Sequence, residues 1–334
     1  MTVKCFAAKG PREVLVPFSY ELGALGPHEV LISVSHCGIC RSDVHLIDND
    51  WGISQYPLVP GHEIVGRVET IGTEVENLDV GTRVGIGWQS GACLECEWCA
   101  SGRDNLCPDN RATCVGRYGG FADTVIADSR YAFPIPDGLT SENAAPLMCG
   151  GITVYSPLSF NNVRPHMKVG VVGVGGLGHL ALQFANAFGC EVTAFSSSPS
   201  KEAEARVLGA DRFVNSADPG QLEAEAGTQD FLIVTANVDL DWQAYVNVLR
   251  PGGHLCFVGA VPHPIQIHAM SLIVGAKSLS GSPIGGRKSI AEMLDFSARH
   301  GIEAQVEVMP MYQVNEALDK VRANQARYRI VLRN

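Results

Sequence analysis

The sequence feature that most constrains the fold lies in the middle of the chain, where an apolar run leads into closely spaced glycines. Residues 169–174 read Val-Gly-Val-Val-Gly-Val, as expected of a parallel strand that is covered on both faces. Gly173, Gly175 and Gly178 follow in the spacing G-x-G-x-x-G. Apolar residues then recur at helical spacing, namely Leu177, Leu180, Ala181, Phe184 and Phe188. A strand, a glycine turn and a helix in this order predict a β-α-β unit that binds a dinucleotide.

The region after these glycines continues the alternation of strands and helices. Strands are predicted at residues 191–195, 231–234 and 254–258, and helices at 200–208 and 242–249. Right-handed β-α-β units of this kind build a doubly wound parallel sheet, so the fold class is α/β. We place this domain at residues 151–285.

The first part of the chain is rich in predicted strands instead. Short apolar segments at residues 30–35, 64–71 and 83–88 are separated by Gly and Asp turns, which predicts a small barrel-like domain. The chain after residue 285 predicts helices at 289–299 and 314–322 and a closing strand at 328–332. That strand can return to the first domain, so we assign residues 1–150 and 286–334 to one discontinuous β-rich domain.

Four cysteines stand close together in the spacing C-x2-C-x2-C-x7-C, at Cys93, Cys96, Cys99 and Cys107. Four thiolates can close a tetrahedral Zn²⁺ site with no open position, and such a site organises a loop that has little apolar surface of its own. The alternative is two local disulfides. It is disfavoured because we find no signal peptide and because the cluster belongs to a large acidic chain.

Composition narrows the classes of partner. The chain has 334 residues, of which 46% are hydrophobic and 18% charged, enough for a sizeable core. Its net charge of −10 argues against nucleic acid or an anionic membrane as a partner, and no apolar run is long enough to span a membrane. The 11 cysteines, without a secretion signal, lead us to expect reduced thiols and a cytoplasmic protein that acts on a small molecule.

Each glycine of the loop has an expected role in coenzyme binding. Gly173 permits a tight turn, Gly175 lets the backbone approach a pyrophosphate, and Gly178 lets helix and strand pack closely. Gly176 and Leu177 complete the loop, and the free N–H groups at the start of the helix would face the anion. The alternative is a glycine turn of no function, which the surrounding strand and helix disfavour.

The end of the second predicted strand indicates which dinucleotide binds. An NAD site has an acidic residue there for the ribose 2′-OH, whereas this chain has Ser196, Ser197 and Ser198 followed by Lys201. Without a carboxylate to repel a 2′-phosphate, NADP(H) is favoured. Alternatively, Ser198 only caps a helix at Pro199 and Lys201 is solvated.

Further motifs reveal a family resemblance. They are Cys37-Gly-Ile-Cys40-Arg-Ser-Asp-Val-His45, Gly61-His62-Glu63, the segment from Asn49 to Val59, Cys149-Gly-Gly151 and the closing segment from Ala326 to Leu332. Together with the four cysteines and the glycine loop they cover essentially the whole chain. The chain resembles zinc-dependent medium-chain alcohol dehydrogenases, closest to the cinnamyl alcohol dehydrogenase branch and its bacterial NADPH-dependent aldehyde reductases. The resemblance implies a GroES-like catalytic domain with a zinc lobe near residues 90–110, a Rossmann domain, two zinc ions per chain and a homodimer.

The resemblance also implies a catalytic zinc site. Its ligands would be Cys40, His62 and Cys149, with substrate, water or Glu63 in the fourth position, as catalytic zinc requires. Asp43 would accept a hydrogen bond from the other nitrogen of His62, and Cys37 would be a buried thiol nearby. Taken singly, His62, Cys149 and Glu63 could equally be core or surface residues, and only their joint pattern favours the site.

The remaining roles that the resemblance implies concern protons, coenzyme and substrate. Ser42 would stand next to the zinc-bound oxygen and pass its proton through the coenzyme ribose to His45, although Ser42 could also be a helix N-cap. Arg41 would pair with the coenzyme pyrophosphate, and Thr153 would contact the nicotinamide. Trp51 and Trp88 are candidate walls of an apolar substrate slot.

We therefore expect reversible reduction of a broad range of aldehydes by NADPH. A dedicated cinnamyl alcohol dehydrogenase is less favoured, because Cys107 is followed by Pro-Asp-Asn-Arg-Ala-Thr, without the aromatic residue of the plant enzymes. An NAD-linked polyol or formaldehyde dehydrogenase is opposed by Ser197, where those enzymes have an acid. A zinc-ribbon interaction module is opposed by the acidic charge and the nucleotide loop, and a zinc-free quinone reductase lacks this ligand set.

Overall fold

The computed structural model describes all 334 residues and divides the chain into two compact units. The first comprises Met1–Ile152 and Ile284–Asn334, and the second comprises Thr153–Pro283. The discontinuous domain expected from the sequence thus has a counterpart whose boundaries lie close to the predicted ones. No helix combines the length and the apolar character that crossing a membrane requires.

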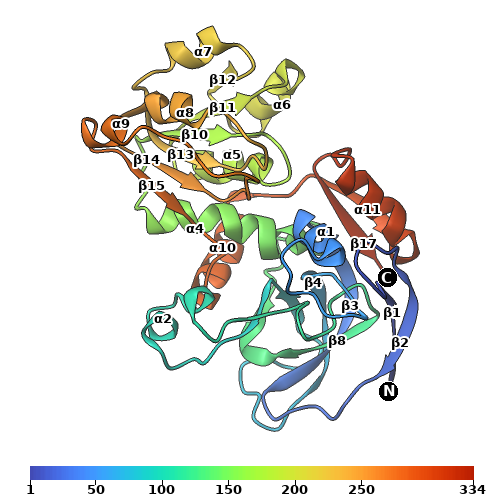
Figure 1. Ribbon diagram of the computed structural model, residues 1–334. Helices are drawn as coiled ribbons and strands as arrows, with labels where there is room; N and C mark the ends of the chain where they lie inside the picture. The colour runs from blue at the N-terminus through green and yellow to red at the C-terminus, as the bar shows by residue number, and fades with distance from the viewer. The chain divides into compact units, whose positions relative to one another are not determined.

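The first unit is built on a mixed, mostly antiparallel sheet around a long central strand, β3 (Figure 1). Its strand order is β16-β17-β3-β4-β5-β9, and β8 also pairs with β3. The strands are β3 (Glu29–Ile39), β4 (Glu63–Ile71), β5 (Arg83–Ile86), β8 (Thr124–Asp128), β9 (Ala132–Pro134), β16 (Val306–Pro310) and β17 (Arg329–Arg333). Because β17 pairs antiparallel with β3, the closing strand does return to the first domain, as the sequence predicted.

Short elements complete the first unit. The predicted strand at 83–88 ends at Ile86, and two further two-stranded sheets, β1 with β2 and β6 with β7, were not predicted. These strands are β1 (Thr2–Ala7), β2 (Val16–Glu21), β6 (Gln89–Gly91) and β7 (Arg111–Ala112). The helices are α1 (Arg41–Asp48), α2 (Glu97–Ala100), η1 (Asp104–Leu106), η2 (Ser129–Tyr131), α3 (Ser141–Pro146), η3 (Leu147–Gly151), α10 (Arg287–His300), η5 (Met311–Gln313) and α11 (Val314–Arg322). Helix α4 (Ile152–Phe160) leads into the second unit.

The second unit is a six-stranded parallel sheet in the order β12-β11-β10-β13-β14-β15, which confirms the doubly wound α/β fold (Figure 1). Its strands are β10 (Lys168–Val172), β11 (Glu191–Ser196), β12 (Arg212–Asn215), β13 (Gln229–Val234), β14 (Leu249–Phe257) and β15 (Ser278–Gly281). Its helices are α5 (Gly178–Ala187), η4 (Pro199–Lys201), α6 (Glu202–Val207), α7 (Pro219–Ala224), α8 (Trp242–Val248) and α9 (Ala269–Ile273). Strand β10 is apolar on both faces because Val171 and Val172 are both buried.

Candidate active site and metal clusters

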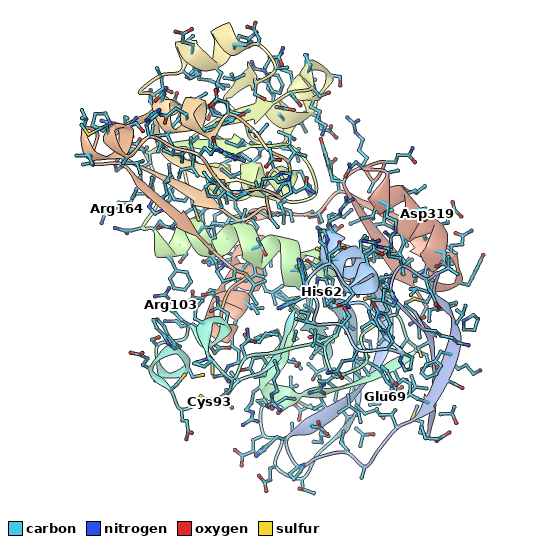
Figure 2. The ribbon with its side chains drawn as sticks, viewed as in Figure 1. His62, Glu69, Cys93, Arg103, Arg164 and Asp319 are labelled. Atoms are coloured by element: carbon cyan, nitrogen blue, oxygen red, sulfur yellow. The ribbon has the colours of Figure 1, made fainter.

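Cys40, His62 and Cys149 come together in the first unit although they are far apart in the sequence. Cys40 immediately precedes α1, His62 immediately precedes β4, and Cys149 lies in the π-helical turn η3. The sulfur atoms of Cys40 and Cys149 are 4.0 Å apart, and one ligand atom from each of the three residues and Glu63 lies within 4.8 Å of the others. Figure 2 shows His62 beside α1, in the interior of this unit.

The donor set fits a zinc ion with one open position. The imidazole of His62 is fully buried, yet its Nε2 atom has no hydrogen-bond partner. A buried nitrogen without a partner is costly, and a metal ion would satisfy it. Two sulfurs and one imidazole nitrogen are ligands of the kind that catalytic zinc takes, with the fourth position left for substrate or water.

Asp43 organises this cluster from the first turn of α1. Its carboxylate is fully buried and accepts three hydrogen bonds of 2.9 Å, from the backbone N–H groups of Cys40 and Gly61 and from Nδ1 of His62. The last of these is the hydrogen bond expected from the sequence, and it leaves Nε2 of His62 directed to the cluster. Cys40, not Ser42, is the N-cap of α1, because Asp43 bonds back to its N–H; the alternative role of Ser42 as the cap is therefore wrong.

In the absence of a metal ion, the ligands of this cluster hold protons that a bound cation would displace. The hydrogen bond with Cys149 holds the pKa of Cys40 well below its ordinary value, while the same hydrogen bond and burial raise the pKa of Cys149. The two thiols therefore share one proton. Burial opposes a charged imidazole at His62, but the negative charges of Asp43 and Cys149 outweigh it and raise the pKa of that side chain.

Glu63 is also buried in this region and faces a cation that sequence reasoning gave no role. Its Oε1 atom pairs with the guanidinium of Arg329 in β17, and its Oε2 atom has no partner. Burial raises the pKa of Glu63 to about 7, although Arg329 acts in the opposite direction. A side chain at Gly38 would collide with Oε2 of Glu63, since an added Cβ would lie 2.1 Å away. This glycine therefore makes room for the carboxylate.

The expected proton-transfer residues lie on α1. Ser42 Oγ lies 3.7 Å from Cys40 Sγ, next to the metal cluster. His45 is one turn further along, and its Nδ1 lies 2.7 Å from a carboxylate oxygen of Asp50, a partner the sequence did not indicate. The side chain of His45 is 28% exposed, so its ring can exchange protons with water.

Two tryptophans lie beside these groups. The ring of Trp88 meets His62 edge-on at 5.0 Å, and Trp51 meets Trp88 edge-on at 5.9 Å. Trp51 also lies 5.1 Å from the ring of His45. Trp51 is 42% exposed, so it is no core residue. The two indoles thus line one side of the region next to His62.

Arg41 has partners other than the pyrophosphate expected from the resemblance. Its Nη1 atom donates to the carbonyls of Val321 and Arg322, at 3.0 and 3.2 Å, at the end of α11. The last carbonyls of a helix lack partners within the helix and carry partial negative charge, which attracts the guanidinium. In this structure Arg41 therefore ties α1 to α11.

The four cysteines of the lobe form a second cluster, in which Figure 2 labels Cys93. Their ligand atoms lie within 4.8 Å of one another, and Cys93 Sγ lies 3.9 Å from Cys99 Sγ and 3.5 Å from Cys107 Sγ. Disulfide sulfurs would be about 2 Å apart, so these are free thiols that fit a closed Zn²⁺ site. Backbone N–H groups, first that of Glu95, lower the pKa of Cys93 to about 7.

The glycine loop of the second unit has the geometry that the motif requires. Gly173 has a φ of +95°, and a Cβ at Gly178 would lie 1.9 Å from the carbonyl oxygen of Gly173. Gly175, in contrast, has nothing within 4 Å of an added Cβ, so its backbone is open to a ligand. Helix α5 starts at Gly178 with Leu177 as its N-cap residue.

The serines expected to bind a 2′-phosphate follow β11. Ser196 ends the strand and is buried, whereas Ser197 is exposed. Ser198 precedes Pro199 but its side chain makes no capping hydrogen bond. Lys201 is not simply solvated, because its Nζ donates to the carbonyl of Val174 in the glycine loop at 2.5 Å. Thr153 is buried near the start of α4.

Comparisons with known proteins agree with these features. The family model of the alcohol dehydrogenase GroES-like domain matches residues 26–137, and that of zinc-binding dehydrogenases matches residues 176–299. The chain is 47% identical to an aldehyde reductase of Synechocystis sp. over 330 residues, covering 99% of this chain and 98% of the relative.

Solved structures resemble the whole chain as well. A cinnamyl alcohol dehydrogenase from Sorghum bicolor is 38% identical, with a TM-score of 0.95 over 100% of this chain and 98% of that one. A structure of CAD from Helicobacter pylori complexed with NADP(H) is 32% identical, with a TM-score of 0.92 and the same coverage.

Proposed function

The chain belongs to the zinc-dependent medium-chain alcohol dehydrogenase family, in the branch of cinnamyl alcohol dehydrogenases and aldehyde reductases, and we propose that it reversibly reduces aldehydes to primary alcohols with NADPH. The observation that carries this proposal is the convergence of Cys40, His62 and Cys149 around an imidazole nitrogen without a partner. When bound there, Zn²⁺ supplies a Lewis acid that polarises a carbonyl oxygen.

The protein's own residues then have separate tasks. Asp43 fixes the orientation and tautomer of His62, so that the imidazole keeps its free nitrogen toward the cluster. The hydroxyl of Ser42 lies 3.7 Å from Cys40 Sγ and delivers a proton to the oxygen of the product. His45, held by Asp50 and reached by solvent, replaces that proton, because an imidazole can both accept and donate a proton.

Coenzyme choice follows from the glycine loop and the residues after β11. The open backbone at Gly175 receives the pyrophosphate, and the exposed Ser197 with Lys201 receives the 2′-phosphate of NADPH. Thr153 contributes on the nicotinamide side. No carboxylate stands among Ser196, Ser197 and Ser198 to reject the phosphate.

The substrate slot that we propose is apolar and broad. Trp51 and Trp88 offer ring faces and edges to an aliphatic or aromatic aldehyde, and neither carries a charge that would demand a polar substrate. We propose no dedicated substrate within this class.

We further propose that the protein is a cytoplasmic homodimer. Strand β15 is an edge of the parallel sheet, and in the segment before it Met270, Ile273 and Val274 are 62%, 68% and 79% exposed. An unpaired strand edge that follows exposed apolar side chains suits a second copy of the chain. Two clusters of free thiols suit a reducing compartment. Light scattering of the purified protein should give twice the monomer mass, and cell fractionation should find it with cytoplasmic markers.

The decisive experiment assays a panel of aldehydes with NADPH and with NADH, alongside elemental analysis. We expect two zinc ions per chain, turnover of several aldehydes and a preference for NADPH. Cys40→Ser should abolish turnover while leaving the fold unchanged by circular dichroism. Ser197→Asp should shift the preference toward NADH by at least about tenfold, because a carboxylate next to the 2′-phosphate costs several kcal/mol. An unchanged coenzyme ratio would remove the phosphate-site assignment, and no turnover of any aldehyde would remove the function.

A further inference from the structure

Asp104, inside the four-cysteine lobe, reaches out of the lobe to the start of helix α10. It lies in η1, between Cys99 and Cys107, and its side chain is fully buried. Its Oδ1 atom accepts a hydrogen bond of 3.1 Å from the backbone N–H of Arg287, the first residue of α10, which is 183 positions later in the chain. A carboxylate in this place caps the helix and also faces its positive end.

The contact between the lobe and α10 is tight on either side of this hydrogen bond. A Cβ at Gly286, the residue before α10, would lie 2.2 Å from the carbonyl oxygen of Gly102 and 2.8 Å from Oδ1 of Asp104. The guanidinium of Arg287 lies over the ring of Tyr131 at 5.3 Å, and Tyr131 belongs to the buried cluster that contains Cys99 and Cys107. The beginning of α10 is thus seated directly on the lobe.

The same helix contacts the turn that carries Cys149. Met293 of α10 is fully buried, and its sulfur would lie 3.2 Å from a Cβ built at Gly151. Gly151 is the last residue of η3, whose π-helical turn positions Cys149. Helix α10 therefore touches the four-cysteine lobe at its first turn and the Cys149 turn about two turns later.

We propose that α10 couples the two metal clusters, so that the filled lobe slows the release of zinc from Cys40, His62 and Cys149. Asp104 is the positioning residue of this link. When the lobe loses its ion, η1 loosens and Asp104 no longer caps α10. The first turns of the helix then fray, Met293 no longer supports η3, and Cys149 moves more freely. The inference rests on the zinc occupancy in the proposed function.

The test measures zinc release from the holoenzyme by an excess of a chromophoric chelator. Cys40→Ser, which lacks the catalytic ion, identifies which kinetic phase belongs to which cluster. We expect Asp104→Ala to accelerate the catalytic phase about fivefold, which is the typical loss of stability from a removed helix cap expressed as a ratio of rates. Met293→Ala should accelerate the same phase without changing release from the lobe, because it removes the contact of α10 with η3 and leaves the contact with the lobe in place.

A matched control separates this link from general destabilisation. Asp218→Ala removes another helix cap, that of α7 in the second unit, where the side chain accepts from the N–H of Gly220. It should leave both release phases unchanged. If Asp104→Ala accelerates release from the lobe alone, or if Met293→Ala leaves the catalytic phase at the wild-type rate, the coupling is refuted. Zinc content and aldehyde turnover of the wild-type enzyme would stay as proposed in that case, so the two failures are distinguishable.

Discussion

Replacing Asp43 with Asn is the sharpest test of how the catalytic cluster is built. The carboxylate receives only donors, from Cys40, Gly61 and His62, and it has no contact with water. An amide has one oxygen and one NH₂ group. In its better orientation it keeps the oxygen toward Gly61 and His62, and its NH₂ group then faces the N–H of Cys40.

The loss of unfolding free energy in Asp43→Asn follows from these three hydrogen bonds. A hydrogen bond to a charged group contributes about 1.5–3 kcal/mol, and one between neutral groups about 0.5–1.5 kcal/mol. One bond is lost and two become neutral, so the unfolding free energy of the metal-free protein should fall by about 3.5–6 kcal/mol. The weaker bond to His62 alone should reduce zinc affinity about 10- to 100-fold.

The assay is competition between the protein and a chelator of known zinc affinity, with urea unfolding of the metal-free protein measured in parallel. Asp230→Asn serves as the control, because its carboxylate also accepts from a backbone N–H, that of Lys168, but lies in the second unit. The reasoning is wrong if Asn at position 43 leaves zinc affinity within about twofold of wild type, since a supporting hydrogen bond to a metal ligand is worth more than that.

Two further predictions concern other parts of the chain. Gly178→Ala should lower the unfolding free energy by about 1–3 kcal/mol and weaken NADPH binding, since its Cβ would meet the carbonyl oxygen of Gly173 at 1.9 Å. In Gly175→Ala the added Cβ meets nothing within 4 Å, so this variant should bind NADPH more weakly without losing stability. An equal decrease in melting temperature in both variants would contradict this. Burial lowers the pKa of His36 despite Glu142, so below pH of about 6.5 the unfolded chain binds more protons at this residue. The unfolding free energy should therefore fall as pH drops, by at most about 1.4 kcal/mol per unit, and less in His36→Gln; urea titrations that give both proteins the same slope would refute this.

Much of the fold could be predicted because its signals are local. The run at 169–174 and the glycines after it specify strand, turn and helix within twenty residues, and the structure has β10, the loop and α5 in that order. The same is true of the lobe, where the spacing of four cysteines predicts one cluster. The ligands Cys40, His62 and Cys149 were reached only through the family resemblance, since nothing in their separate surroundings brings them together.

Other features depend on contacts that no local pattern reveals. Arg329 meets Glu63 across 266 positions, and Arg287 meets Asp104 across 183, so each looks like an ordinary surface charge in the sequence. The π-helical turn around Cys149 and the helix cap at Cys40 could not be predicted for a related reason. Both depend on backbone hydrogen bonds that side-chain periodicity does not encode.

The pairing of β17 with β3 has a consequence for how the protein is made. Ribosomes add about 5–20 residues per second, so roughly 10–35 s pass between the synthesis of Cys149 and that of Arg329. During that time the nascent chain already contains every ligand of the catalytic cluster, but Glu63 still lacks its cationic partner and β3 has an unpaired edge. Translation thus delivers the groups that bind the ion well before the strand that pairs with β3 and supplies the cation for Glu63.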